Sequence, residues 1–232
     1  FVENLKKEYA GTVLYERYIL GLWSAAEGAI YKAFADDPKR FIIADDLIDQ
    51  DNQQHIEIIR AVVGVDFGGG TSAHAFSCVG FTRGYQQMVL LHEFREKDAL
   101  TPDKLNEAFI QFVRECKRMW NVTDCYCDSA EQTLINGLRA AAAKERIGIN
   151  IQNALKKPIN DRIRCLTSLM GSNRYKVAEH CKETIEALRS AVWDSKVLTE
   201  DVRLDNGTTN IDSLDAQEYA YEREMRTLVS RW

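Results

Sequence analysis

The stretch RAVVGVDF, from Arg60 to Phe67, decides the fold because it is a short, apolar, β-branched run that ends at an acid. Three glycines follow at Gly68–Gly70, which is typical of a turn after a strand. A carboxylate inside such an apolar run is costly to bury alone, so we expect Asp66 to have a partner, and a divalent cation is one. The run therefore predicts a buried strand with a functional acid at its carboxyl end.

Strand and helix patterns continue along the chain from this run. Two more strand-like runs follow after short links, which predicts an antiparallel meander of three strands. Strands and helices then alternate, so we expect an α/β fold with a mixed sheet, three antiparallel strands and then parallel strands, flanked by helices. The expected strands are 60–67, 75–81, 87–94, 122–127, 147–151 and an edge strand at 174–178, and the expected helices are 102–119, 129–143, 160–170, 179–190 and 213–230. Ahead of them, residues 2–34 predict a helix and an irregular connector, and residues 44–56 a solvated loop or exposed helix start.

Composition and charge limit the classes of function. The chain has 232 residues, and 45% are hydrophobic, which is typical of a globular protein rather than a disordered tail or a coiled-coil rod. No apolar run approaches the roughly 18 residues that a membrane-spanning helix needs, so we do not expect the chain to be a membrane protein. The net charge of −5 argues against binding nucleic acid by net charge alone. The segment Lys144–Lys176 nevertheless carries +6, leaving −11 elsewhere, and is either a phosphate-binding patch or an ordinary solvated face.

The six cysteines show no C-x-x-C spacing, so the sequence predicts no zinc site. Most lie in apolar stretches, where a free thiol behaves as a small hydrophobe. We therefore expect reduced core thiols in a cytosolic protein rather than a disulfide framework. These cysteines are Cys78, Cys116, Cys125, Cys127, Cys165 and Cys181.

Two further acids stand where an α/β sheet usually holds function. Asp128 ends the strand at 122–127, and Asp215 lies near the start of the last helix. Because the carboxyl ends of strands border a ligand-binding crevice, we expect Asp66, Asp128 and Asp215 to converge. Three carboxylates give hard oxygen ligands for Mg²⁺ or Mn²⁺, and two such ions can hydrolyse a phosphodiester. The alternative is that each acid is a turn former or a helix cap.

Neighbouring residues leave further alternatives open. Asp212 shares a helix face with Asp215, and it either adds to the metal site or caps the helix. Asp124 is a rival acid in the strand before Asp128. The turn DFGGGT, Asp66–Thr71, loosely resembles the phosphate-binding turn of actin-type and Hsp70-type ATPases. The chain has neither a P-loop nor a second glycine turn of this kind, so we expect no nucleotide in this fragment.

Several motifs occur in an order that resembles one family. They are YERYILGLW (15–23) with AEGAIY (26–31), VGVDFG (63–68), DSAE (128–131), KKPI (156–159), WD (193–194) and D-x-x-D-A-x-x-Y (212–219). In these motifs the chain resembles the nuclease half of the large terminase subunit of tailed bacteriophages, the motor protein that cuts and packages concatemeric DNA.

This resemblance implies a ribonuclease H-like fold and an endonuclease that cleaves double-stranded viral DNA concatemers with two metal ions, Mg²⁺ or Mn²⁺. Matched by motif, Asp66, Asp128 and Asp215 are the implied catalytic and metal-binding acids. Many relatives have His where this chain has Asp212, so the resemblance leaves open whether Asp212 binds metal or orients water.

The resemblance also implies partners and domains. Lys156, Lys157 and Arg162, in the basic segment, are expected to contact double-stranded DNA. Residues 1–56 are expected to be the end of the ATPase half and the linker, and residues 57–232 the nuclease domain. The further expected partners are that ATPase half of the same subunit, the portal protein and the small terminase subunit, on the procapsid in the cytoplasm of the bacterial host, with no membrane involved.

Three other functions remain open from the sequence. A different ribonuclease H-like enzyme, such as a resolvase or transposase core, would share the acids but lack the leading YERYILGLW segment. An actin-type ATPase would need a second glycine turn. A non-catalytic docking module for the phage portal would retain the acids only as remnants.

Overall fold

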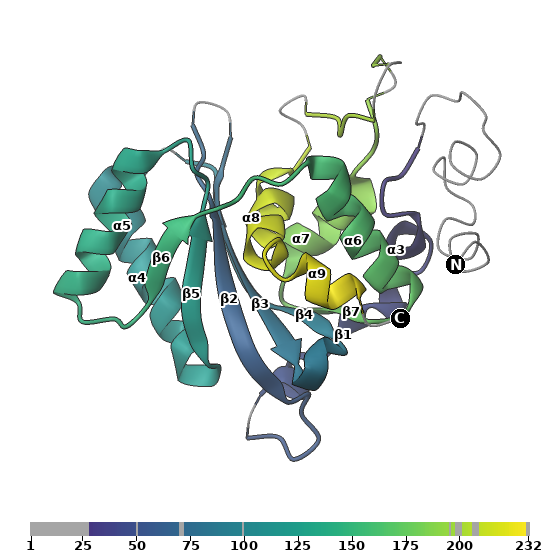
Figure 1. The fold of residues 1–232 in the computed structure, drawn as a ribbon, viewed down its shortest axis with the longest axis horizontal. Coiled ribbons are helices and arrows are strands. Elements are labelled where there is room, and N and C mark those ends of the chain that lie inside the picture. Colours follow the sequence, from purple (N-terminus) through teal and green to yellow (C-terminus); the bar gives the residue numbers. More distant parts are fainter. Residues whose placement is uncertain are drawn as a thin grey trace.

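The computed structural model describes residues 28–49, 51–69, 72–98, 100–194, 196–197, 201–205 and 209–230. The YERYILGLW motif, most of the expected helix and connector at 2–34, and Gly70–Thr71 of the glycine turn lie outside these residues. In the described part, a seven-stranded mixed sheet runs in the order β1-β7-β4-β3-β2-β5-β6. Helices cover both faces of this sheet (Figure 1), so the predicted flanked, mixed α/β sheet is confirmed.

The strands keep the chain order that the sequence indicates. They are β1 (Ile42–Ile43), β2 (Ile58–Asp66), β3 (His74–Thr82), β4 (Met88–Glu96), β5 (Val122–Cys127), β6 (Asn150–Asn153) and β7 (Tyr175–Ala178). The α-helices are α3 (Lys32–Asp36), α4 (Pro102–Met119), α5 (Gln132–Lys144), α6 (Ile159–Gly171), α7 (Lys182–Ser190), α8 (Asp212–Tyr221) and α9 (Met225–Val229), with short 3₁₀ helices η1 (Pro38–Arg40), η2 (Asp45–Ile48) and η3 (Arg83–Tyr85).

Strand β2 lies inside the sheet between an antiparallel and a parallel neighbour. It pairs antiparallel with β3 and parallel with β5, and β3 pairs antiparallel with β4. The predicted meander is therefore confirmed. Helices α4 and α5 lie on one face of the sheet, and α6, α7 and α8 lie on the other (Figure 1). Because both faces are covered, β2 carries a continuous apolar run instead of an alternating pattern.

Buried apolar side chains form one core around this sheet. Phe76 and Phe94 stack with ring centroids 4.7 Å apart under α4. All six cysteines are free and buried, as predicted. Tyr31 and Phe34 are also fully buried, and β1 extends the sheet beside β7, so the described residues ahead of position 57 fold with the sheet. No helix among the described residues is long and apolar enough to cross a membrane.

Three local expectations were wrong, and one short strand was not predicted. Strand β6 covers 150–153 instead of 147–151, and β1 within 42–43 was not foreseen because two residues are too short for a periodic pattern. The strand β7 is not at the edge, since β1 pairs with it on its outer side. The expected helix at 213–230 is two helices, because the chain turns at 222–224 between α8 and α9.

Candidate functional site

Asp66 and Asp128 lie next to each other at the carboxyl ends of two parallel strands. Val65 in β2 is paired with Cys127 in β5, and the amide of Asp128 donates to the carbonyl of Val65 at 2.9 Å, one residue beyond the ladder. The carboxyl edge of parallel strands is where α/β sheets bind ligands. Asp128 also forms a local turn, because its Oδ1 accepts from the amide of Ala130 at 2.9 Å.

Helix α8 carries the other two acids onto the same edge. Asp212 and Asp215 lie in its first turn, where the helix dipole stabilises negative charge. Asp212 is not the helix cap, since Ile211 occupies that position. The backbone of α8 sits directly on β2 at Gly64, where a Cβ atom would come within 1.9 Å of the Ala216 carbonyl oxygen. This close approach, possible only at a glycine, brings Asp215 to Asp66.

The four acids form one electrostatic cluster. Burial raises the pKa of Asp66 to about 9, together with the negative charges of Asp215, Asp128 and Asp212. Lys156 acts in the opposite direction on the same pKa. Within the described residues, the Asp66 carboxylate has no ion-pair partner, so it is the member of the cluster that most needs a cation.

Each of the other three acids is neutralised by a basic side chain. Lys156 Nζ lies 2.5 Å from Asp128 Oδ1, and Arg95 Nη2 lies 3.1 Å from Asp212 Oδ2. Arg203 Nη2 donates to Asp215 Oδ1 at 2.6 Å. Basic side chains of the protein itself therefore pair with these three carboxylates in this structure.

The donor chemistry suits a hard divalent cation, since the cluster offers carboxylate oxygens and Asp66 has no basic partner among the described residues. As the side chains stand, no set of three His, Cys, Asp or Glu residues in the described ranges is arranged to hold a metal ion. In this arrangement Asp128 is paired with Lys156 and Asp215 with Arg203.

Behind Asp215 lies a buried charge cluster that the sequence did not reveal. Arg203 Nη1 donates to Glu218 Oε1 at 2.9 Å, and Tyr31 Oη donates to the same carboxylate oxygen at 3.3 Å. Burial opposes the charge of Arg203, but Glu218 and Asp215 outweigh it and raise its pKa. Arg162 completes the cluster, with Nη1 3.0 Å from Glu218 Oε2 and 3.6 Å from Asp215 Oδ1.

These contacts alter the expected set of DNA-binding residues. Arg162 is buried and faces Glu218, so its position gives no support to the expected phosphate contact. Lys157 directs its Nζ to the carbonyl oxygen of Glu222 at 2.8 Å. Lys156 is the one of the three whose ammonium group lies beside the acids, and its side chain is 40% exposed.

Asp124, the rival acid, and His74 near the glycine turn both have structural partners. Asp124 pairs with Arg60 at 3.2 Å and accepts from Asn150 at 3.1 Å, and these hydrogen bonds lower its pKa although burial opposes this. It is not among the main causes of the raised pKa of Asp66, and its partners Arg60 and Asn150 lie outside the acid cluster. His74, the histidine nearest the glycine turn, is buried and accepts from the Gly68 amide at 3.1 Å.

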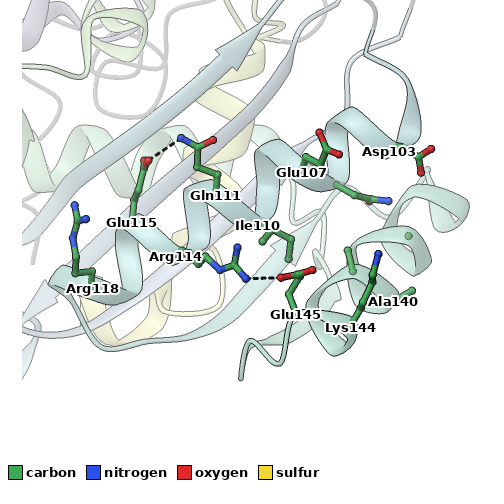
Figure 2. A pocket seen from close by; sticks show the side chains of 13 residues that line it. Asp103, Glu107, Ile110, Gln111, Arg114, Glu115, Arg118, Ala140, Lys144 and Glu145 are labelled. Carbon is green, nitrogen blue, oxygen red and sulfur yellow. Dashed lines mark hydrogen bonds and ion pairs between the residues drawn. The ribbon is translucent and has the colours of Figure 1, made fainter.

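A separate groove of about 1030 Å³ lies between α4 and α5. Figure 2 shows Arg114 of α4 directed at Glu145, with which it forms an ion pair at 2.5 Å. Charges of both signs line the groove, including Glu107, Arg118 and Lys144. None of the clustered acids lines it, so the candidate site is distinct from this groove.

Comparisons with known proteins identify the family and the fold. A family model described as the terminase RNaseH-like domain matches residues 63–224. The large terminase of a thermophilic bacteriophage has a TM-score of 0.72 at 24% identity, over 95% of this chain and 51% of that protein, so this chain spans about half its length. The comparison with curated proteins found no match.

Two isolated nuclease domains are also similar. The nuclease domain of the bacteriophage P22 large terminase has a TM-score of 0.61 at 17% identity, over 87% of this chain and 97% of that one. The large terminase nuclease domain of bacteriophage SPP1, solved with bound Mn, has a TM-score of 0.55 at 15% identity, over 79% and 95% of the two chains. The expected ribonuclease H-like fold is thereby confirmed.

Proposed function

The chain belongs to the terminase RNaseH-like domain family, and on that premise we propose that it is a metal-dependent DNA endonuclease domain. One observation carries the proposal. Asp66, Asp128, Asp212 and Asp215 meet at the carboxyl edge of β2 and β5, and burial together with the negative charges of the other three raises the pKa of Asp66. Asp66, which has no basic partner among the described residues, needs a proton or a bound cation, and clustered carboxylates that hold divalent cations can form a phosphodiester-cleaving centre.

We assign the metal to Asp66, Asp128 and Asp215, with Asp212 as a further ligand. The bound Mn in the SPP1 nuclease domain supports a divalent cation in this fold. Two bound Mg²⁺ or Mn²⁺ ions would supply an activated water and stabilise the leaving oxygen of the phosphodiester. The carboxylate of Asp66 provides the centre of this site, because it is the acid without a basic partner among the described residues.

The basic side chains have different roles in this proposal. Lys156 leaves Asp128 when the site is loaded and turns to the DNA phosphate, which its exposure allows. Arg203 and Arg162 remain behind Asp215 and fix its orientation through Glu218. Lys157 anchors its own loop to Glu222 and is not assigned to DNA.

The biological substrate and partners follow from the family as proposals. We infer that the substrate is double-stranded viral DNA in concatemers, cut during genome packaging. The similar large terminase of the thermophilic bacteriophage is about twice as long, as the 51% coverage indicates, which supports an ATPase half of the same subunit as a partner. The portal protein, the small terminase subunit and a location on the procapsid in the host cytoplasm complete this proposal.

The expected domain division is refined in the same way. The catalytic region remains 57–232, but Tyr31, Phe34 and Phe41 are fully buried against it, and β1 pairs with β7. We therefore propose that the nuclease unit includes residues 28–56, and that any linker to an ATPase half lies ahead of them.

A plasmid-nicking assay with Mn²⁺ tests the proposal on wild type, Asp66→Ala and Asp124→Asn. We expect wild type and Asp124→Asn to nick supercoiled DNA and Asp66→Ala to be inactive. Of the two substituted residues, Asp66 belongs to the acid cluster and Asp124 does not. Equal nicking by wild type and Asp66→Ala would reject the site. Absence of nicking by folded wild type would contradict the proposal for this chain and favour the non-catalytic docking module.

A further inference from the structure

Glu222 is a fully buried carboxylate that binds three consecutive backbone amides. It lies just after α8, and its Oε1 accepts from the amides of Leu155 and Lys156, the latter at 3.3 Å. Its Oε2 accepts from the amide of Lys157 at 3.0 Å. A buried carboxylate is costly unless hydrogen bonds satisfy it, and these amides do so.

The segment that Glu222 holds is the loop between β6 and α6, residues 154–158. The loop is fixed at its start as well, because the amide of Ala154 donates to the carbonyl of Cys127 at 2.7 Å. At its centre Lys156 has a φ of 51°, in the left-handed region that a residue with a Cβ atom rarely adopts. This strained conformation persists only where surrounding contacts determine it, and the Glu222 hydrogen bonds are such contacts.

The conformation of this loop determines where the Lys156 side chain lies relative to the candidate site. With its backbone held in this turn, Lys156 places Nζ 2.5 Å from Asp128 Oδ1. Asp215 lies on α8, and Glu222 caps the carboxyl end of the same helix, so α8 determines the position of both an acid and the lysine opposite it. Glu222 itself is fully buried, and its carboxylate hydrogen bonds are to the loop amides.

We propose that Glu222 is a positioning residue for DNA cleavage, which sets Lys156 at the acid cluster through the backbone of residues 155–157. The proposal rests on the proposed function, because it gives Lys156 its role at the phosphate. Loss of the carboxylate releases the loop from the left-handed turn at Lys156, and the ammonium group moves away from Asp128. The effect on cleavage is therefore transmitted entirely by Lys156.

A double-variant cycle tests this route. Steady-state nicking of supercoiled plasmid in Mn²⁺ is measured for wild type, Glu222→Gln, Lys156→Ala and the double variant, well below their melting temperatures. We expect Glu222→Gln and Lys156→Ala each to lower kcat by about 10- to 100-fold, since a displacement of about 1 Å has effects of this size. The double variant should be no slower than Lys156→Ala alone, because residues acting in one chain of contacts are not additive.

The control is Glu224→Gln, two residues further on, where the carboxylate pairs with Arg60 away from the loop. It should melt earlier but nick at the wild-type rate. Multiplied losses in the double variant, or unchanged nicking by folded Glu222→Gln, would overturn the positioning role while leaving the nuclease assignment intact. Wild type that does not nick would instead reject the proposed function.

Hydrogen exchange provides a readout that does not depend on activity. In wild type, the amides of residues 155–157 should exchange slowly, and Glu222→Asp, which keeps the charge but shortens the side chain, should speed their exchange while the amides of β2 are unchanged. Fast exchange of these amides in wild type would overturn the proposal even if Glu222→Gln does not fold.

Discussion

Gly64 of β2 lies directly beneath the carbonyl oxygen of Ala216 in α8, and a Cβ atom at position 64 would approach that oxygen to 1.9 Å and the Ala220 amide nitrogen to 2.7 Å. Both atoms belong to the helix backbone, so no side-chain rotation relieves the clash. The distance between helix and strand at this point determines how near Asp215 comes to Asp66.

The first prediction follows from that contact. Gly64→Ala should lower the free energy of unfolding by about 3 kcal/mol, because overpacking of a buried backbone contact forces the helix outward. Urea unfolding followed by circular dichroism measures the change. Gly171→Ala is the matched control, since nothing lies within 4 Å of its added methyl group, and it should be neutral or slightly stabilising. Similar unfolding midpoints for Gly64→Ala and wild type would refute the close packing.

Asp66 should make the metal-free protein less stable as the pH rises. Its pKa is raised from 3.8 to about 9 in the folded protein, so between about pH 4 and pH 9 the folded state holds a proton that the unfolded state has lost. The free energy of unfolding therefore falls through this window. Asp66→Asn removes this dependence, and in EDTA at pH 8 it should exceed wild type by a few kcal/mol.

Thermal unfolding in EDTA from pH 5 to pH 9 measures this effect. Added Mg²⁺ should stabilise wild type at pH 8 but have much less effect on Asp66→Asn, because the cation replaces the proton at Asp66. Parallel pH profiles for the two proteins would show that burial and the acidic neighbours do not raise the pKa of Asp66.

Arg203 should be essential for stability although it follows no recognisable motif. Arg203→Met leaves Glu218 and Asp215 with less compensating charge in a buried cluster, and the expected loss is about 3 to 5 kcal/mol. The control is Arg83→Met, whose ion pair with Glu57 joins side chains that are 80% and 63% exposed. That change should alter the unfolding free energy by less than about 0.5 kcal/mol. Equal effects of the two variants in denaturant titrations would argue against the buried cluster.

Lys156→Met should change metal affinity and DNA cleavage in opposite directions. Removing the ammonium group frees Asp128 and makes the cluster more negative, so Mn²⁺ should bind up to about tenfold more tightly. Cleavage should fall because the phosphate contact is lost. Calorimetric titration with Mn²⁺ and the nicking assay measure the two quantities. A parallel loss of both would indicate that Lys156 only maintains the structure.

The acids at the strand ends could be predicted because they depend on local pattern. The run around Asp66 and the strand before Asp128 each combine β-branched residues with a terminal acid, and both strands formed as expected. Their adjacency follows from parallel pairing of β2 with β5, which strand–helix alternation favours. Asp215 could also be predicted, from its place near the start of the last helix, and its approach to Asp66 depends on Gly64.

The partners of these acids could not be predicted, because they come from contacts between distant parts of the chain. Arg203 stands in a connection before α8, and nothing near it in the sequence indicates a buried ion pair with Glu218. The one available signal was the WD motif, since Trp193 forms a bridge with Arg203. Arg162 was expected to contact DNA because it belongs to the basic segment, but it is buried on α6.

Glu222, at the end of α8, also has partners that could not be predicted from the sequence. The sequence around it has no glycine or proline to mark a helix end, so one continuous helix at 213–230 was expected. The chain turns there instead. The Glu222 carboxylate binds backbone amides far away in the sequence, including that of Lys157, which is 65 residues earlier. Side-chain periodicity carries no information about such backbone partners.

The central claim is that Asp66, Asp128 and Asp215 together hold divalent metal. Anomalous diffraction from crystals soaked in MnCl₂ tests it most directly, with crystals of Asp66→Ala as the control. We predict strong anomalous density between the three carboxylates in wild type, none there in the variant, and Lys156 displaced from Asp128. Mn²⁺ density elsewhere on the protein with none at these acids, or equal density in the Asp66→Ala crystals, would contradict the account.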